Sequence, residues 1–200
     1  MSLIDNLLFI TVFYIIGSIP FALILTKLLG HGDIRDIGSG NVGATNVLRT
    51  GNKYLAFGVL CLDISKGLLP FLILSALYDT NTLHSIFICH FAILGHIFPI
   101  WLKFKGGKGV ATYIGFLIGL NFLIGLYFLL TWIIIAFISR YSSLSSLVAS
   151  LVVPLYFFFV NPNNFVVIFL LYLFLIISLK HRENIKRLMN GSENKIKLSK

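Results

Sequence analysis

The sequence predicts an all-α integral membrane protein, a bundle of seven transmembrane segments in a single domain over residues 1–200. Of the 200 residues, 58% are hydrophobic and only 12% are charged, and the mean hydropathy is +0.94. A soluble domain is about 45–50% apolar and about 25% charged. Long apolar runs alternate with polar stretches that hold most of the basic residues. This composition excludes a soluble globular domain, a disordered chain and a disulfide-stapled secreted miniprotein.

Six apolar runs carry the predicted segments. They cover residues 7–29, 54–78, 83–104, 110–139, 144–160 and 165–179. A spanning helix needs about 20 apolar residues at a rise of about 1.5 Å each. Gly17, Ser18 and Pro20 lie in the middle of the first run and predict a kink with close packing. Because this run lacks a basic flank and a small-residue cleavage site, we expect a retained span and not a signal peptide.

The fourth run is too long for one upright span. Its 30 residues would form a helix of roughly 45 Å, against a hydrocarbon core of about 30 Å. It is either one strongly tilted helix or two segments that turn near Asn121. The turn places nearly all Lys and Arg on one side of the membrane, as the positive-inside rule requires. We therefore expect seven segments, with the N-terminus outside, the C-terminus cytoplasmic, and a short segment over residues 110–120.

The basic residues indicate anionic partners at the membrane surface. The net charge is +9, from 16 Lys and Arg against 7 Asp and Glu. Because these cations lie between apolar runs, we expect anionic lipid head groups or anionic substrates to be the partners, and no nucleic acid. Cys61 and Cys89 lie inside apolar runs and are interpreted as packing residues.

The first polar stretch, residues 38–49, is rich in glycine and short donors. It contains Gly38, Ser39, Gly40, Asn41, Gly43, Thr45, Asn46 and Arg49. Convergent backbone and side-chain donors together with one arginine are typical of a phosphate site. The three glycines also fit the G-x-G-x-x-G spacing, but a dinucleotide site needs a preceding strand, and here an apolar run precedes. A simple glycine-rich turn between helices is the other interpretation.

The second polar stretch, residues 103–109, combines lysines and glycines immediately before a predicted helix. Its candidate ligands are Lys105, Gly106, Gly107 and Lys108. Backbone N–H groups at the helix start would add to the lysine charges and favour a bound phosphate. The pattern is not a Walker A loop, because Gly109 stands where that loop has Ser or Thr. A basic membrane anchor is the alternative, although an anchor needs no glycines.

The third polar region combines a serine-rich helix start with the stretch after the last apolar run. Ser143 and Ser146 are candidate ligands, with helix capping as the alternative. His181 and Asn184 are three residues apart, so they share one face of a helix that continues beyond the membrane. The lysines and arginines around them could equally form a solvated basic face.

Two pairs of polar residues interrupt the apolar runs. Asp63 and Lys66 share one helical face, and buried charges in a membrane are usually paired or line a site. They are therefore either an ion pair that serves packing or, through Lys66, part of a substrate site. His90 and His96 are six residues apart without a carboxylate companion, so we expect no metal site.

Three signatures in one order give the chain a family resemblance. They are residues 38–49, residues 95–99 leading into 104–112, and residues 181–188. The chain resembles the bacterial acyl-phosphate:glycerol-3-phosphate acyltransferases, over nearly its whole length. The resemblance implies transfer of a fatty acyl group from acyl phosphate to the 1-hydroxyl of glycerol 3-phosphate, giving 1-acylglycerol 3-phosphate and phosphate. This is the first acylation of phospholipid synthesis.

The resemblance also implies where the reaction takes place. It implies a multi-pass protein of the inner (plasma) membrane with seven helices and its motifs facing the cytoplasm. Neither acyl-CoA nor acyl carrier protein is used directly, and no cofactor or metal is expected. We expect a monomer in contact with membrane lipid.

The resemblance assigns roles to the polar residues. Residues 106–108 would hold glycerol 3-phosphate, while Ser39, Asn41 and Arg49 serve the first motif. His181 and Asn184 serve the third. Because acyl phosphate is already activated, the protein needs mainly to position the reactants and neutralise the leaving phosphate, with Arg49 and Lys108 as the candidates.

Two questions stay open at this point. The proton acceptor is either His181 or a phosphate oxygen of a substrate, and His181 could instead be a phosphate ligand. A small anion or phosphate-ester transporter is the alternative function, although it should place charge at mid-membrane and show repeat symmetry.

Overall fold

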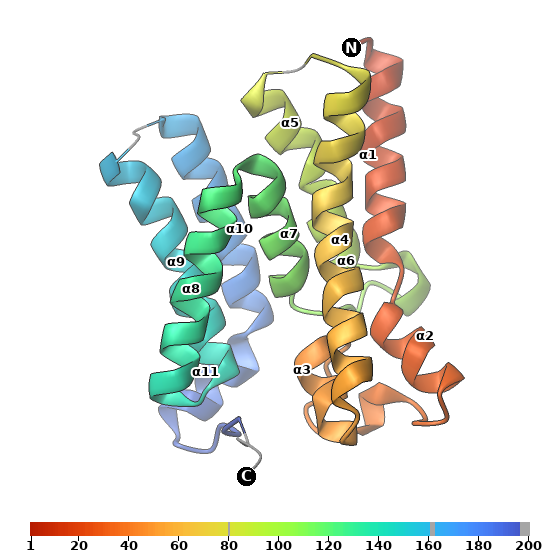
Figure 1. The fold of residues 1–200 in the computed structure, drawn as a ribbon, viewed down its shortest axis with the longest axis vertical. Coiled ribbons are helices and arrows are strands. Elements are labelled where there is room, and N and C mark those ends of the chain that lie inside the picture. The colour runs from red at the N-terminus through yellow and green to blue at the C-terminus, as the bar shows by residue number, and fades with distance from the viewer. Residues whose placement is uncertain (80, 161–162, 197–200) are drawn as a thin grey trace. The chain divides into compact units, whose positions relative to one another are not determined.

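A computed structural model describes residues 1–79, 81–160 and 163–196, and all regular structure in these ranges is helical (Figure 1). The chain forms two compact units, Met1–Phe122 and Leu123–Lys200, here called unit 1 and unit 2. The helices of unit 1 are α1 (Leu3–Ser18), α2 (Phe21–Leu28), η1 (Ile34–Asp36), α3 (Ala44–Val47), η2 (Leu48–Thr50), α4 (Lys53–Leu77), α5 (Thr82–Cys89), α6 (Phe91–Ile97), η3 (Ile100–Leu102) and α7 (Val110–Leu120). Then follow α8 (Phe122–Ser139), α9 (Ser142–Val160), α10 (Asn164–Lys180) and α11 (Arg182–Met189).

Within the described residues, five segments are long and apolar enough to cross a membrane. They are Leu3–Leu28, Lys53–Leu77, Thr82–Leu102, Phe122–Ser139 and Ser142–Val160. A sixth is reached if α10 and α11, which meet at an angle of 66°, count as one broken span. The α7 helix is apolar but has only 11 residues. The all-helical membrane fold agrees with the sequence prediction, and the count of seven segments stays a prediction.

Helix breaks occur at two of the places that the sequence indicated. The first run divides between Ser18 and Phe21, because Pro20 has no N–H to continue the helical ladder. The fourth run divides at Asn121, whose extended backbone separates α7 from α8. The third run is divided more finely than one continuous span, into α5, α6 and η3.

One expectation about the last helix was wrong. The expected arrangement was a single helix that continues from the last span and carries His181 and Asn184 on one face. The structure instead ends α10 at Lys180 and starts α11 at Arg182, with a bend of 66°. His181 occupies the corner, with φ −96° and ψ 6°, outside both helices. The two side chains therefore belong to a corner and the following helix.

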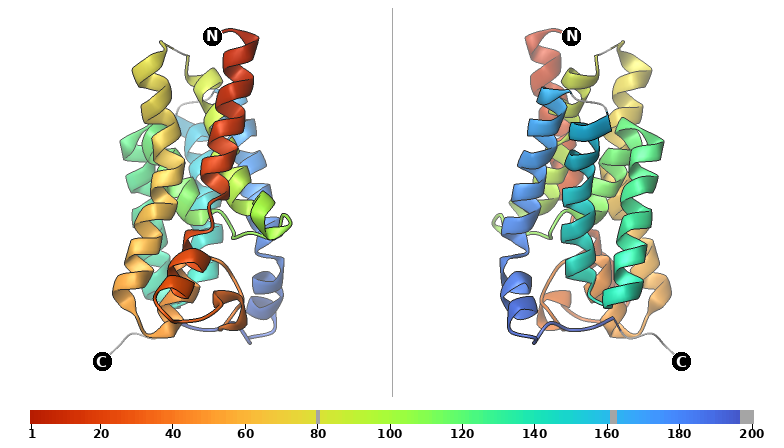
Figure 2. Two further views of the ribbon diagram at one scale, coloured as in Figure 1. Left: turned by 90° about the vertical axis from the view of Figure 1, so that its right-hand side faces the viewer. Right: turned by 90° about the vertical axis from the view of Figure 1, so that its left-hand side faces the viewer.

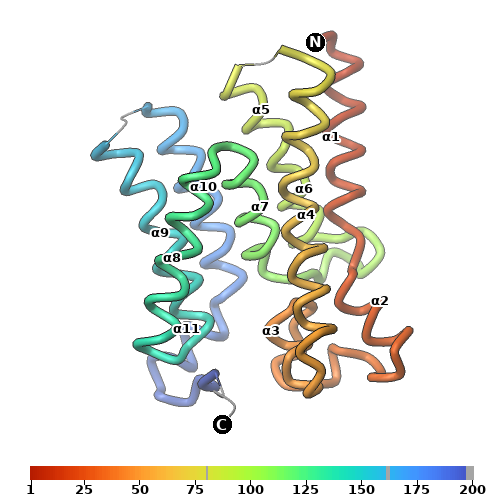
Figure 3. Tube along the Cα trace, viewed as in Figure 1, coloured from red at the N-terminus to blue at the C-terminus, as the bar shows by residue number. Residues whose placement is uncertain are grey.

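Close helix contacts hold unit 1 together. The α4 helix packs along α7, and α1 packs along α6 (Figure 3). A Cβ on Gly67 would overlap the carbonyl of Thr112 in α7, and a Cβ on Gly17 would overlap the carbonyl of Ala92 in α6. Small residues at such contacts let helix backbones approach closely, which is how helices associate within a bilayer.

The end of unit 1 that carries α2 and α3 has a small apolar core of its own (Figure 1). Its buried side chains are Ala22, Leu23, Ile34, Val42, Val47, Leu55, Ala56 and Val59. These residues come from α2, η1, α3, the start of α4 and the loop before α3. The glycine-rich stretch over residues 38–49 is therefore anchored in this core through its own Val42 and Val47.

Unit 2 consists of three neighbouring helices and a short terminal one (Figure 2). The α9 helix packs against α10, and α11 contacts α9. Trp132 Nε1 in α8 donates a hydrogen bond of 3.0 Å to Ser146 Oγ in α9. The residues after α11 return to the connection between α8 and α9, since the Ile196 N–H donates to the Arg140 carbonyl at 2.7 Å.

Candidate active site

Asn46 organises the first glycine-rich stretch. Its side chain is 2% exposed, and Nδ2 donates to the carbonyls of Ile34 (3.0 Å) and Ile37 (2.9 Å). Its Oδ1 accepts from the Ser39 N–H at 3.0 Å, and from Ser39 Oγ and Arg49 Nη1 at 3.3 Å each. One buried amide thus holds the backbone of the loop and converges two candidate ligands, Ser39 and Arg49, on the same oxygen.

Glycine at position 38 is required for this convergence. Gly38 has φ +58°, which side-chain-bearing residues rarely adopt. A Cβ there would also lie 2.5 Å from Arg49 Cδ and 2.6 Å from Asn46 Oδ1. Arg49 occupies the space that a side chain at position 38 would need.

The remaining candidates of this stretch surround that centre. Gly40 also has a positive φ, and its N–H donates to the Ile37 carbonyl at 3.0 Å. The Gly43 N–H donates to the Asn41 carbonyl at 3.1 Å, and Gly43 then precedes α3. Ser39, Thr45 and Arg49 are exposed, whereas Asn41 is half-buried. The exposed donors are therefore the ones available to a ligand from solution.

The second glycine-rich stretch is attached to α6 through its backbone. The N–H of Gly106 donates to the Ile97 carbonyl at 3.2 Å, and that of Gly107 to the His96 carbonyl at 3.1 Å. Gly109 precedes α7 with φ +82°. The N–H groups of Gly106 and Gly107 are thus used inside the protein, whereas the N–H groups that we expect to favour a bound phosphate are those at the start of α7. Lys105 is exposed and Lys108 half-buried, so the side chains supply the charge.

The two stretches meet inside unit 1. A Cβ on Gly107 would lie 3.0 Å from the Val42 carbonyl of the first stretch. It would also overlap Nε2 of His96, whose side chain is buried. A side chain at position 107 would therefore have no room, because His96 and the Val42 carbonyl fill that space.

A buried ion pair lies next to this junction. Lys66 Nζ is 2.7 Å from Asp63 Oδ1, and both side chains are at most 3% exposed. His96 Nδ1 is 3.5 Å from Lys66 Nζ and 3.6 Å from Asp63 Oδ1. A cavity of about 10 Å³ borders all three and also Gly106 and Gly107. The mutual pairing of Asp63 and Lys66, which the sequence left as one of two interpretations, is present.

Unit 2 gathers its polar residues around one carboxylate. Glu193 Oε1 accepts from Ser143 Oγ at 2.8 Å and from Asn184 Nδ2 at 2.6 Å. Glu193 Oε2 accepts from Arg187 Nε at 2.7 Å. Burial disfavours the charged carboxylate, but these three hydrogen bonds outweigh it and lower the pKa of Glu193.

The other candidates of unit 2 have different neighbours. His181 Nδ1 is 2.8 Å from the Ile177 carbonyl, and because a carbonyl only accepts, Nδ1 carries a proton. Nε2 is then the basic nitrogen of the neutral ring. Ser146 Oγ donates to the Ser142 carbonyl at 2.8 Å and accepts from Trp132. Ser143 thus belongs to the Glu193 cluster, and Ser146 to the contact between α8 and α9.

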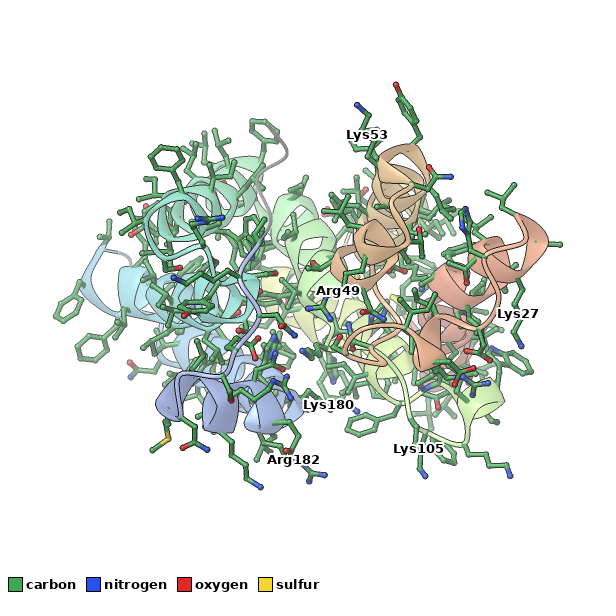
Figure 4. All side chains as sticks on the ribbon, turned by 90° about the horizontal axis from the view of Figure 1, so that it is seen from below. Lys27, Arg49, Lys53, Lys105, Lys180 and Arg182 are labelled. Atoms are coloured by element: carbon green, nitrogen blue, oxygen red, sulfur yellow. The ribbon has the colours of Figure 1, made fainter. Side chains whose placement is uncertain are left out.

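Cations surround the motif end of unit 1. Seen from that end, Lys53 and Lys105 extend away from the helices, and Arg49 projects from η2 (Figure 4). Lys27, also labelled there, is 3.4 Å from Asp33. Arg49 belongs to the first glycine-rich stretch, through its contact with Asn46, and Lys105 and Lys108 belong to the second.

Comparison with known proteins identifies the family. Residues 7–191 match the family described as glycerol-3-phosphate acyltransferase. The chain belongs to the glycerol-3-phosphate acyltransferase family. The glycerol-3-phosphate acyltransferase of Pelagibacter ubique is 54% identical over 187 residues, covering 92% of this chain and 94% of that protein. The one from Agrobacterium fabrum is 53% identical over 183 residues, covering 92% and 88%.

Solved structures of the same family support the fold. A crystal structure of PlsY (YgiH), an integral membrane glycerol 3-phosphate acyltransferase, in its glycerol 3-phosphate form, matches with a TM-score of 0.90 and 36% identity, covering 96% of each chain. Its lysophosphatidic acid form matches with a TM-score of 0.87 and 35% identity. The family resemblance read from the motifs is confirmed. This family member is an acyltransferase enzyme and a multi-pass membrane protein.

Sequence reasoning about this acyltransferase missed three residues. His96 was considered only as a metal ligand, although it lies in the Gly95–Pro99 signature. Glu193 lies in none of the three signatures, and Arg187 lies in the signature over residues 181–188 but was assigned no role. A usable signal for Glu193 was its rarity, since the chain has only 7 acidic residues and this one lies in a strongly basic tail.

Proposed function

We propose that this enzyme transfers a fatty acyl group from acyl phosphate to the 1-hydroxyl of sn-glycerol 3-phosphate. The hydroxyl oxygen attacks the acyl carbon, the bond from that carbon to the phosphate oxygen breaks, and the hydroxyl proton is released. The products are 1-acylglycerol 3-phosphate and inorganic phosphate. The family match over residues 7–191 carries the proposal, and it favours an acyltransferase over a transporter.

The first stretch suits the leaving phosphate of acyl phosphate. Ser39 and Arg49 are exposed donors, and the buried Asn46 side chain orients both of them through its Oδ1 atom. Acyl phosphate is a mixed anhydride, so the barrier falls mainly through positioning and through stabilising the charge that develops on the departing phosphate. The Arg49 guanidinium, held beside the Ser39 hydroxyl, can do both without a covalent intermediate.

The second stretch suits the phosphate of glycerol 3-phosphate. Lys108 and Lys105 supply the positive charge, and the attachment of Gly106 and Gly107 to α6 fixes the path of the backbone between them. A rigid loop lowers the entropy that a bound substrate must otherwise lose. In this proposal the glycines shape the loop, and the lysines bind the substrate.

The proposal keeps His181 and Asn184, both in unit 2, as the residues of the third motif. With Nδ1 of His181 directed at the Ile177 carbonyl, Nε2 of the neutral ring can accept the hydroxyl proton. The protonated ring could instead bind a phosphate, with a substrate phosphate oxygen as the proton acceptor. A His181→Gln variant distinguishes these roles. Loss of the acidic limb of the pH–rate profile indicates a base, and a raised KM with an unchanged profile indicates a phosphate ligand.

The proposal includes the membrane arrangement. We expect seven segments, with α7 as the short one, the N-terminus outside and the C-terminus in the cytoplasm. The break at Asn121 and the basic residues of the polar stretches support this arrangement through the positive-inside rule. The active site then faces the cytoplasm from the inner membrane, in contact with lipid, and the enzyme is a monomer.

The direct test uses purified protein with acyl phosphate and labelled glycerol 3-phosphate. We expect labelled lysophosphatidic acid and one equivalent of inorganic phosphate for each acyl group transferred. Acyl-CoA in place of acyl phosphate serves as the control donor and should give no product. Uptake of glycerol 3-phosphate into proteoliposomes without product would instead support a transporter.

A further inference from the structure

We propose that Asp63, Lys66 and His96 form a positioning cluster that fixes the second glycine-rich stretch for binding of glycerol 3-phosphate. This inference rests on the proposed function of residues 106–108. It assigns Lys66 to the support of the loop, where the sequence analysis had made it a substrate ligand. Neither Asp63 nor His96 had a role in the reaction.

The cluster has the contacts that such a role needs. On one side, Lys66 Nζ is 2.7 Å from Asp63 Oδ1 and 3.5 Å from His96 Nδ1. On the other side, the backbone carbonyl of His96 accepts a hydrogen bond of 3.1 Å from the Gly107 N–H. The Nε2 atom of His96 fills the space where a side chain at position 107 would lie. The imidazole ring therefore connects the ion pair on α4 to the backbone of the loop.

The ring orientation depends on the ion pair. The Lys66 ammonium can only donate, so the His96 Nδ1 that faces it acts as the acceptor in the neutral ring. Nδ1 also lies 3.6 Å from Asp63 Oδ1, so both members of the ion pair face this nitrogen, while Nε2 lies on the side of Gly107 and the Val42 carbonyl. Asp63 in turn holds the ammonium, which also lies 4.8 Å from the centre of the Phe21 ring. Displacing any member would let the ring turn against the loop.

Packing alone does not account for this cluster. Two charges inside a membrane span lose their hydration, and apolar residues of similar size would fill the same volume at lower cost. We therefore infer that the ion pair is present because it positions the neighbouring substrate loop, and not because it stabilises the fold. A shift of the loop by a fraction of an ångström would displace Lys108, which immediately follows Gly107.

The main test replaces both charges together. Lys66→Met alone leaves the Asp63 carboxylate buried without its partner, and we expect it to be poorly folded. The double variant Asp63→Asn with Lys66→Met keeps the size of both side chains without charge. We expect it to fold, with a KM for glycerol 3-phosphate raised roughly tenfold and kcat within about threefold of wild type. An unchanged KM, or a loss confined to kcat, would overturn the proposal.

A second set of variants works even if the double variant does not fold. His96→Asn keeps an oxygen that can accept from Lys66, whereas His96→Leu does not. We expect the leucine variant to raise the KM for glycerol 3-phosphate roughly tenfold and the asparagine variant to recover most of that loss. The matched control is His90, which is also buried and lies at the N-terminal cap of α6, the helix that carries His96. His90→Asn and His90→Leu should leave this KM unchanged.

The cluster would have only a packing role if the variants at positions 96 and 90 changed the KM for glycerol 3-phosphate equally. A wild-type KM in His96→Leu would lead to the same conclusion. Failure of the proposed function is recognised separately. In that case wild-type protein forms no lysophosphatidic acid, whereas failure of the present inference leaves wild type active and the variants kinetically unchanged.

Discussion

Each unit pairs a largely buried carboxylate with a cation, Asp63 with Lys66 in unit 1 and Glu193 with Arg187 in unit 2, but the two carboxylates are supplied in different ways. Asp63 lies within the long α4 helix, three residues from Lys66, and its side chain is 3% exposed. Glu193 follows the last helix, and its side chain is 7% exposed beside an Arg187 that is 36% exposed. The first carboxylate is part of a span, and the second is brought in by the chain terminus.

This difference shows which ligands each unit can offer. In unit 1 the carboxylate lies beneath the loops, and the exposed donors Ser39 and Arg49 converge on a neutral amide oxygen. In unit 2 the donors Ser143, Asn184 and Arg187 are directed at the carboxylate itself. We therefore expect changes in unit 1 to act mainly on catalysis, and changes at Glu193 to act mainly on the order of the terminal segment.

The largest effect is expected from Arg49→Ala. It removes the exposed cation of the first stretch and leaves the apolar core beneath it intact. We expect kcat/KM to fall by about 10²–10³-fold, the usual cost of losing one donor to a developing charge, with the thermal unfolding temperature nearly unchanged. Arg35→Ala is the matched control, because Arg35 is exposed and bonds only locally to Asp33. Near-normal turnover of Arg49→Ala would make the first stretch structural.

A smaller loss is expected from Lys108→Ala, which tests the second stretch. Removing this ammonium should raise the KM for glycerol 3-phosphate by roughly 10–100-fold, because the charge binds the substrate phosphate. Lys103→Gln is the control, since Lys103 is exposed and lies at the other end of the same stretch. Steady-state kinetics with glycerol 3-phosphate varied measures both. If the two variants behave alike, Lys108 is only part of a basic surface.

The fold class and family were predictable from the sequence because they depend on local signals. Apolar run lengths set the helices, Pro20 cannot continue a helix, and the motifs identify the family. The interruption at Asn121 followed from charge distribution. The bend at His181 was not predictable, because no proline or glycine marks it and the backbone there turns within an ordinary helical sequence.

The candidate site was predictable as a set of residues but not as a network. Asn46 was expected to be a ligand, yet it is the buried residue that orients Ser39 and Arg49. Gly106 and Gly107 were expected to be substrate ligands, yet their N–H groups donate to the carbonyls of Ile97 and His96 in α6. Such outcomes depend on contacts between residues far apart in the sequence, and a motif gives residue types without their partners.

A further prediction compares two glycines that both have positive φ. Gly38→Ala adds a Cβ that meets Arg49 and Asn46, whereas Gly30→Ala meets nothing within 4 Å. Both should lose about 1 kcal/mol of stability through backbone strain. We expect Gly38→Ala alone to lower kcat/KM, by roughly tenfold, because it displaces the Arg49 side chain. Equal activity of the two variants would show that the close approach of Arg49 to Gly38 has no catalytic value.

The smallest effect is expected at Glu193, where a substitution separates order from catalysis. Glu193→Gln keeps the side-chain shape but removes the charge that Arg187, Asn184 and Ser143 stabilise. We expect amide exchange in residues 182–196, corrected for intrinsic rates, to become roughly three- to tenfold faster at neutral pH. Unchanged exchange would mean that these hydrogen bonds do not hold the segment.

The pH dependence of the same segment follows from the lowered pKa of Glu193. A carboxylate whose pKa is lower in the folded protein stabilises it fully above the ordinary value of 4.5, and the contribution disappears as the pH falls through the folded pKa. Wild-type protection should therefore be constant at neutral pH and decline only below that value, while Glu193→Gln shows no such decline. Because the cluster contains Ser143 and Asn184, a loss of activity in acid that disappears in Glu193→Gln would extend the influence of Glu193 from the terminal segment to substrate binding.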